Sequence, residues 1–194
     1  AALILKAVGD KIADPRSMRA LGFCVSIAHA QYMARVFSDA GVPAAAVTSA
    51  PESPDRAQTL TALRDGRIAA IFTVDMFNEG VDLPTIDTVL FLRPTESSTI
   101  FLQQLGRGLR RADNKAVLTV LDFVGLQHTN FRFDLKYRAL TGVSRNKLER
   151  SIRDGFPFLP PGTQIVFDRV AQEIVLSNVK KQLKLSTRDL VADV

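Results

Sequence analysis

Cysteine is nearly absent from this sequence. Cys24 is the single cysteine among 194 residues, so an intrachain disulfide and a cysteine-based metal site are both excluded. It lies in the apolar run Phe23–Ile27, where we interpret it as a small buried hydrophobe rather than a reactive thiol.

Long hydrophobic runs are also missing. No apolar stretch reaches the ~20 residues of a membrane-spanning helix. The first residues carry neither a basic leader nor a cleavage pattern. We therefore expect a cytoplasmic protein with no membrane partner. The hydrophobic content of 46% is enough for a packed core.

Two motifs of nucleotide hydrolysis are absent as well. The sequence has no Gly-x-x-x-x-Gly-Lys-Ser/Thr loop to cradle the phosphates of ATP, and no Asp-Glu-x-His box to hold Mg²⁺. Without them, we expect the chain alone to hold no cofactor and no metal, and neither to bind ATP tightly nor to hydrolyse it.

The net charge of +5 is concentrated in one part of the chain. Residues 1–125 contain 13 Lys and Arg against 13 Asp and Glu, whereas residues 126–194 contain 12 against 7. A basic appendage attracts phosphate backbones through counterion release. A solvated surface of mixed charge is the alternative interpretation.

Short apolar runs alternate with amphipathic stretches as far as Phe123, which predicts an α/β fold with a parallel sheet flanked by helices. We expect a connector over residues 1–20, the α/β domain over 21–125, and a small, basic, mostly helical extension over 126–194. The expected strands are the runs Phe23–Ile27, Ala44–Thr48, Ile68–Thr73, Thr88–Leu92 and Ala116–Phe123.

Helices are expected between these strands and in the extension. Gly41 and Gly66 mark the predicted ends of the first two, and Asp55 is a candidate N-cap. The predicted helices are Ala30–Ala40, Asp55–Asp65, Thr99–Arg110, His128–Leu140, Ser144–Asp154 and Arg169–Lys184.

Two segments carry the chemistry. Thr73–Pro84 follows a predicted strand and contains Gly80 and Asp82, so it falls at the carboxyl ends of the strands, where open parallel sheets bind ligands. Gln103–Arg111 places Arg107 and Arg110 at i and i+3, on one face of a helix. An arginine pair stabilises the charge on a transferring γ-phosphoryl group. Taken singly, the segments also fit a capped turn and a basic helix end.

Together and in this order, the two segments resemble motifs V and VI of superfamily 2 DEAD/DEAH-type helicases. Thr73–Pro84 is similar to motif V, with its Gly-x-Asp-x-Pro, and Gln103–Arg110 is similar to motif VI, Gln-x-x-Gly-Arg-x-x-Arg. Phe23–Ile27 with His29 resembles motif IV, the first strand of the second RecA-like motor domain. The stretch after Phe123 resembles the extension of a bacterial restriction-enzyme-like helicase group.

The resemblance implies roles on both sides of a composite site. Arg107 and Arg110 would be arginine fingers that reach ATP held with Mg²⁺ mainly by the preceding RecA-like domain, the expected partner. Thr73, Ser26 and His29 would contact the backbone of DNA or RNA. The residues implied in contacts to the nucleotide are Gly80, Asp82, Gln103 and Gly106.

Other functions stay open from the sequence, among them a protein-interaction adaptor built on a decayed motor domain, against which the intact Gly-Arg-x-x-Arg spacing argues. Another is a non-catalytic nucleic-acid-binding module on a RecA-like scaffold, and a third is a restriction-type translocase that moves on duplex DNA without unwinding it. The aromatic residues of the extension are expected to pack it onto the sheet domain, with base stacking as the alternative. They are Phe131, Phe133, Phe156 and Phe158.

Overall fold

The structure is a computed structural model, and it divides into two compact units. The described residues of the first unit precede residue 124, and those of the second follow residue 130. From residue 183 onward only the backbone is described. The structure describes residues 1–74, 86–93, 117–123, 131–157, 159 and 164–192.

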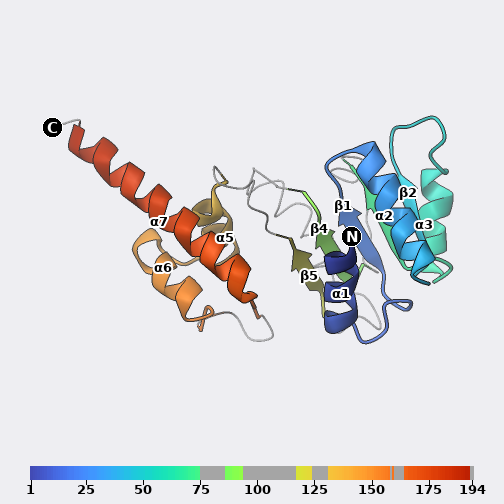
Figure 1. The fold of residues 1–194 in the computed structure, drawn as a ribbon, viewed down its shortest axis with the longest axis horizontal. Helices are drawn as coiled ribbons and strands as arrows, with labels where there is room; N and C mark the ends of the chain where they lie inside the picture. Colours follow the sequence, from blue (N-terminus) through green and yellow to red (C-terminus); the bar gives the residue numbers. More distant parts are fainter. Residues whose placement is uncertain (75–85, 94–116, 124–130, 158, 160–163, 193–194) are drawn as a thin grey trace. The chain divides into compact units, whose positions relative to one another are not determined.

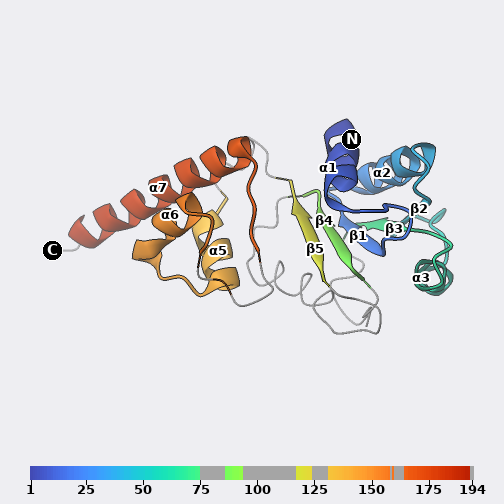
Figure 2. The same ribbon diagram turned by 90° about the horizontal axis from the view of Figure 1, so that it is seen from below.

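The first unit is built on a five-stranded parallel sheet with the order β2-β3-β1-β4-β5 (Figures 1 and 2). β1 pairs with β3 and β4 in register, so that Gly22 lies opposite Phe72 on one side and Leu90 on the other. Each strand has four residues; the strands are β1 (Ala20–Phe23), β2 (Ala44–Val47), β3 (Ala70–Thr73), β4 (Thr88–Phe91) and β5 (Thr119–Asp122).

Helices cover both faces of this sheet. Figure 2 shows α1 and α2 on one side and α3 on the other. α2 packs on β2 and β3, and α3 contacts the same two strands. This arrangement confirms the predicted parallel sheet flanked by helices. The helices are α1 (Ala2–Lys11), α2 (Ile27–Asp39) and α3 (Arg56–Arg64).

Local sequence signals start and stop these helices. The Asp55 carboxylate accepts the Gln58 amide at 2.8 Å and caps α3, which confirms the predicted N-cap. Gly41 (φ 80°) and Gly66 (φ 77°) follow α2 and α3 in the left-handed conformation that glycine adopts without steric cost. Both predicted stop positions are therefore confirmed.

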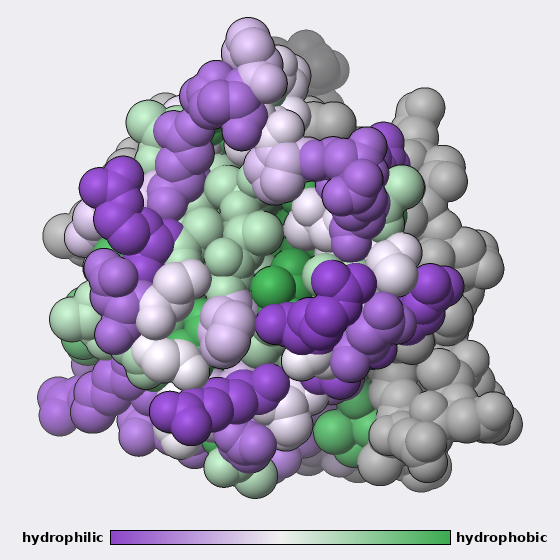
Figure 3. All heavy atoms as spheres, turned by 90° about the vertical axis from the view of Figure 1, so that its right-hand side faces the viewer, coloured by the Kyte–Doolittle hydropathy of each residue, from purple (hydrophilic) through white to green (hydrophobic). Residues whose placement is uncertain are grey.

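β2 is the edge strand of the sheet and lies between α2 and α3. Figure 3 looks onto this side of the molecule, where apolar side chains gather in the middle of the face and hydrophilic ones surround them. The strand contributes three alanines, all of them partly exposed, and the buried Val47.

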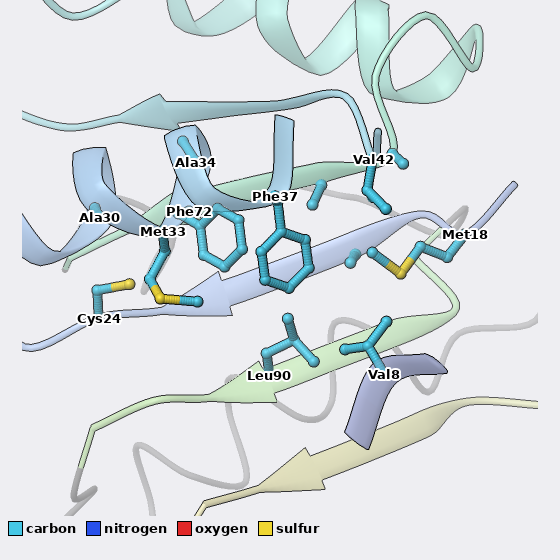
Figure 4. Packing of buried hydrophobic residues seen from close by; sticks show 13 residues of the cluster. Val8, Met18, Cys24, Ala30, Met33, Ala34, Phe37, Val42, Phe72 and Leu90 are labelled. Atoms are coloured by element: carbon cyan, nitrogen blue, oxygen red, sulfur yellow. The ribbon is translucent and has the colours of Figure 1, made fainter. Parts of the chain in front are cut away.

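On the face of the sheet that α1 and α2 cover, the core consists of packed aromatic rings and aliphatic side chains (Figure 4). Phe37 of α2 meets the Phe72 ring edge-on, with centroids 4.9 Å apart and planes at 70°. Val8 of α1 is 1% exposed and joins the same cluster. The first twenty residues, which the sequence assigned to a connector, thus contribute a helix and three core residues, Val8, Met18 and Ala20, to the first unit. Cys24 is fully buried, as interpreted from its apolar neighbours.

The first strand begins and ends earlier than predicted. The sequence placed it over Phe23–Ile27, but β1 spans Ala20–Phe23, and α2 already begins at Ile27. The prediction was wrong because Ser26 caps the helix and thereby converts Ile27 from a strand residue into the first helical one.

The second unit is a cluster of helices with its own core. α5 spans Phe133–Thr141, α6 spans Arg145–Arg153 and α7 spans Arg169–Ala192, and each contacts the other two. This confirms the predicted mostly helical extension. Its buried core consists of Phe131, Phe133, Tyr137, Leu148, Ile152, Phe156, Val175 and Val179.

The aromatic residues of this unit pack against one another. The Phe131 and Phe133 centroids lie 4.5 Å apart, and those of Tyr137 and Phe156 lie 5.7 Å apart. Phe131, Phe133 and Phe156 are 7%, 1% and 4% exposed and belong to the core of the second unit. Phe158 lies outside the described residues.

Candidate nucleic-acid interface

The carboxyl ends of all five strands lie along one edge of the sheet, because every described strand pair is parallel. Chain segments that leave this edge are where open α/β sheets place their ligands. Three of the residues predicted to contact nucleic acid are described there. Thr73 ends β3, while Ser26 and His29 follow β1 at the start of α2.

The side chains of Ser26 and His29 both accept hydrogen bonds from backbone amides at the N-terminus of α2. The Ser26 Oγ accepts the His29 amide at 3.1 Å, and the His29 Nδ1 accepts the Val25 amide at a longer 3.4 Å. This is a reciprocal arrangement like a capping box, with an imidazole where a carboxylate or amide is usual. Ser26 and Val25 are exposed, so this helix end faces solvent.

The imidazole of His29 accepts a hydrogen bond only in its neutral form. Partial burial lowers the pKa of His29 below its usual value, since desolvation disfavours the charged ring. The side chain therefore acts as a neutral acceptor in the folded chain. A neutral His29 offers no positive charge to a phosphate, but the partial positive charge of the α2 N-terminus remains.

Thr73 occupies a different environment from the other two. Its side chain is fully buried at the end of β3, and its carbonyl accepts the Cys24 amide at 2.7 Å. The Thr73 Oγ1 has no hydrogen-bond partner among the described residues. A buried hydroxyl without a partner is uncommon in folded proteins. A phosphate would reach this oxygen only if its neighbours moved.

Two further features of this edge were not predicted. Gln31 of α2 donates to the Glu52 carboxylate at 2.9 Å, which ties the segment after β2 to the first turns of α2. Burial raises the pKa of the Cys24 thiol to about 12. The Arg93 guanidinium, two residues beyond β4, lies near enough to Cys24 to act in the opposite direction and lower this pKa. The sequence signal that could have pointed to Arg93 is its position, because it is a basic residue directly after a predicted strand.

The remaining predicted site residues lie outside the described residues. Their proposed roles therefore stay predictions. Within the part of the chain that the structure describes, no group of three or more His, Cys, Asp and Glu side chains is placed to hold a metal ion. In that part, no helix is long and apolar enough to cross a membrane. The undescribed site residues are Gly80, Asp82, Gln103, Gly106, Arg107 and Arg110.

Comparison with known families identifies the protein family of this α/β domain. The model of the helicase conserved C-terminal domain matches residues 4–112, more than half of the chain, and this stretch includes both motif-like segments. The chain belongs to the helicase C-terminal domain family. Membership confirms the predicted second RecA-like domain of a superfamily 2 helicase.

Curated relatives and solved structures agree with this assignment. A Saccharomyces cerevisiae protein provisionally named ATP-dependent helicase IRC3 is 32% identical over 123 residues, which cover 63% of this chain and 18% of IRC3. The structure of the E. coli DEAD-box protein SrmB, bound to RraA, shares the fold with a TM-score of 0.54 at 19% identity, covering 66% of this chain and 71% of that one.

A likeness to a larger enzyme extends further along the chain. The ATP-dependent type ISP restriction-modification enzyme LlaBIII, solved bound to DNA, matches 84% of this chain and 13% of its own, with a TM-score of 0.52 at 19% identity. The helicase C-terminal domain is thus one part of much longer relatives, because this chain spans only about a fifth of the length of IRC3.

Proposed function

We propose that this helicase C-terminal domain is the second motor domain of an ATP-dependent superfamily 2 DNA helicase or translocase. The observation that carries the proposal is the family match over residues 4–112, which contains both the Gly-x-Asp-x-Pro and the Gly-Arg-x-x-Arg segments in the family order. Its partners are the preceding RecA-like domain and the backbone of DNA or RNA.

The arginine pair supplies the catalytic contribution of this half. Arg107 and Arg110 stabilise the charge that develops on the γ-phosphoryl group of an ATP bound, with Mg²⁺, mainly by the preceding domain. The planar guanidinium fork and the permanent charge of arginine suit phosphate oxygens. The contacts to the nucleotide that complete this side are those of Gly80, Asp82, Gln103 and Gly106.

The nucleic-acid backbone lies along the carboxyl edge of the sheet in this proposal. The exposed N-terminus of α2 supports a phosphate contact at Ser26, because the first amides of a helix have no intrahelical acceptor. His29 contributes as a neutral group. The Thr73 hydroxyl, which has no partner among the described residues, would contact a phosphate once the groups that bury it moved.

The isolated chain is inactive in this proposal, since it lacks a phosphate-cradling loop and an acidic box for Mg²⁺. Closure of the two domains on ATP and their opening after hydrolysis would move the pair along a strand. Such stepping is a population shift between domain arrangements that nucleotide contacts bias.

The test measures ATP hydrolysis by the full-length parent protein, with and without DNA, for Arg107→Ala and Arg110→Ala. Removing an arginine finger should lower turnover by roughly 10³ or more while leaving nucleotide binding largely intact. Arg111→Ala is the matched control, because it removes the same charge from the same segment outside the Gly-Arg-x-x-Arg spacing.

Two results would change the proposal. If turnover stays near that of the wild type while DNA affinity falls, the chain is a nucleic-acid-binding module on a RecA-like scaffold. The likeness to LlaBIII favours a second candidate, a translocase on duplex DNA. A parent protein that displaces a triplex-forming strand but does not separate a duplex would establish that function.

A further inference from the structure

The outer edge of β2 carries backbone groups that face away from the sheet. In a parallel pair, the N–H and C=O of one residue point to the same side, and successive residues alternate. The Pro43 carbonyl accepts the Ala69 amide at 2.7 Å, so Pro43 faces β3. Every second residue after it also faces β3, and the outward-facing ones are Ala44, Ala46 and Thr48.

Two serine hydroxyls form hydrogen bonds with the outward groups of this edge. The Ser38 Oγ accepts the Ala44 amide at 3.2 Å and donates to the Ala44 carbonyl at 3.3 Å. The Ser53 Oγ accepts the Thr48 amide at 3.0 Å. Ser38 belongs to α2 and Ser53 to the segment after β2, so the two hydroxyls approach the strand from different elements. Between them stands Ala46, whose outward groups have no hydrogen bond to the described residues.

An open strand edge is a template for pairing with another chain. The alanine side chains of β2 are small, and the face around them is apolar in its middle (Figure 3), so steric bulk does little to keep a second strand away. An antiparallel pair of two β2 strands around a two-fold axis at Ala46 would use the N–H and C=O of Ala44, Ala46 and Thr48. The serines hold three of these six groups.

We propose that Ser38 and Ser53 close the outer edge of β2 against strand pairing with a second copy of this chain. The partner that this edge fits is the same edge of another copy, because the pattern of outward groups is symmetric about Ala46. With the serines in place, only the two outward groups of Ala46 and the Thr48 carbonyl remain open within the described part of the chain, and the Ala44 amide that would pair with that carbonyl in the second copy is already held by Ser38, so a strand ladder cannot form. This inference is independent of the proposed motor function.

The test compares the double variant Ser38→Ala/Ser53→Ala with the wild type by sedimentation velocity over a roughly hundredfold range of concentration. The wild-type chain should sediment as a monomer throughout, and the double variant as a dimer whose share rises with concentration. Ser49→Ala is the matched control, because this exposed serine lies in the same segment as Ser53 and forms no hydrogen bond with the described residues.

A third substitution identifies the edge itself. Proline is tolerated where an edge N–H faces outward, but it cannot donate to a ladder. Adding Ala46→Pro to the double variant should therefore restore the monomer. A double variant that stays monomeric, or a dimer that persists with Ala46→Pro, would overturn the proposal.

Hydrogen exchange of the wild-type chain tests the same idea without any variant. The Ala44 and Thr48 amides should exchange slowly, because the serine oxygens accept them, and the Ala46 amide between them should exchange much faster. Equal exchange of the three amides would mean that the serines do not hold the edge, and the proposal would fail even if the double variant could not be purified.

Discussion

Replacing Gly22 by alanine should destabilise the first unit although the change adds only one methyl group. A Cβ at this position would lie 2.5 and 2.7 Å from two ring carbons of Phe72, its register partner on β3. The ring cannot easily move aside, because Phe37 meets it edge-on at 4.9 Å. Forcing a methyl group into a well-packed core costs about 1–3 kcal/mol.

The assay is thermal and denaturant unfolding of the 194-residue chain followed by circular dichroism. For a chain of this size, each kcal/mol should lower Tm by roughly 2–4 °C. Gly9→Ala is the matched control: it is the same substitution in the interior of α1, where a Cβ meets nothing within 4 Å. It should stabilise the chain by about 0.5–1 kcal/mol, because alanine favours helix more than glycine does.

A second-site change shows whether the ring is the cause. Phe72→Leu removes the Cε1 atom and replaces the rigid ring by a smaller branched side chain that can turn away from the new methyl group, so Gly22→Ala should cost less in a Phe72→Leu background than in the wild type. The two effects should therefore be non-additive, as expected for residues in contact. The reasoning fails if Gly22→Ala leaves the free energy of unfolding unchanged, or if its cost is the same in both backgrounds.

Two further predictions concern the N-terminus of α2. Stability should fall as the pH drops below about 6.5, the usual pKa of histidine, and down to the lowered pKa of His29, because the unfolded chain takes up a proton there that the folded chain resists. His29→Gln should flatten this part of the pH profile, and an unchanged slope would remove His29 as its origin. Ser26→Asp should keep the free energy of unfolding within about 0.5 kcal/mol, since aspartate caps as well as serine, whereas Ser26→Ala should cost about 1 kcal/mol. If Ser26 contacts phosphate, the aspartate should weaken DNA binding by the parent more than the alanine does; equal affinities would argue against that contact.

The alternation of short apolar runs with amphipathic stretches was sufficient to predict most strands of the first unit. Apolar runs of strand length gave four of the five strands to within a few residues, because a parallel sheet covered on both faces buries every side chain of a central strand. The burial of all four residues in β1, β3 and β4 is the structural reason. The same rule misplaced β1, where the apolar run continues through a helix cap at Ser26.

The extension shows what composition alone leaves out. Some of its basic residues form local ion pairs, such as Arg153 and Lys180 on Glu149 at 2.8 and 3.4 Å. The pair between Arg132 and the buried Asp134, at 2.8 Å, was not predicted either, since nothing in the sequence says that Asp134 would be buried. A count of charged residues predicts neither these ion pairs nor the burial of Asp134, because both depend on which helix faces pack together.

In the candidate site, too, some residues could be predicted from the sequence, whereas their contacts and burial could not. The resemblance to motif VI predicts roles for Arg107 and Arg110, whose permanent charge and planar fork suit phosphate oxygens. Residue type and spacing do not predict that Ser26 is engaged by the His29 amide or that Thr73 is buried. Since the Ser26 oxygen already accepts a hydrogen bond, a phosphate at this helix end would be held by the backbone amides beyond it more than by the serine hydroxyl. The backbone of α2 would then make the contact, and Ser26 would contribute by capping the helix that carries those amides.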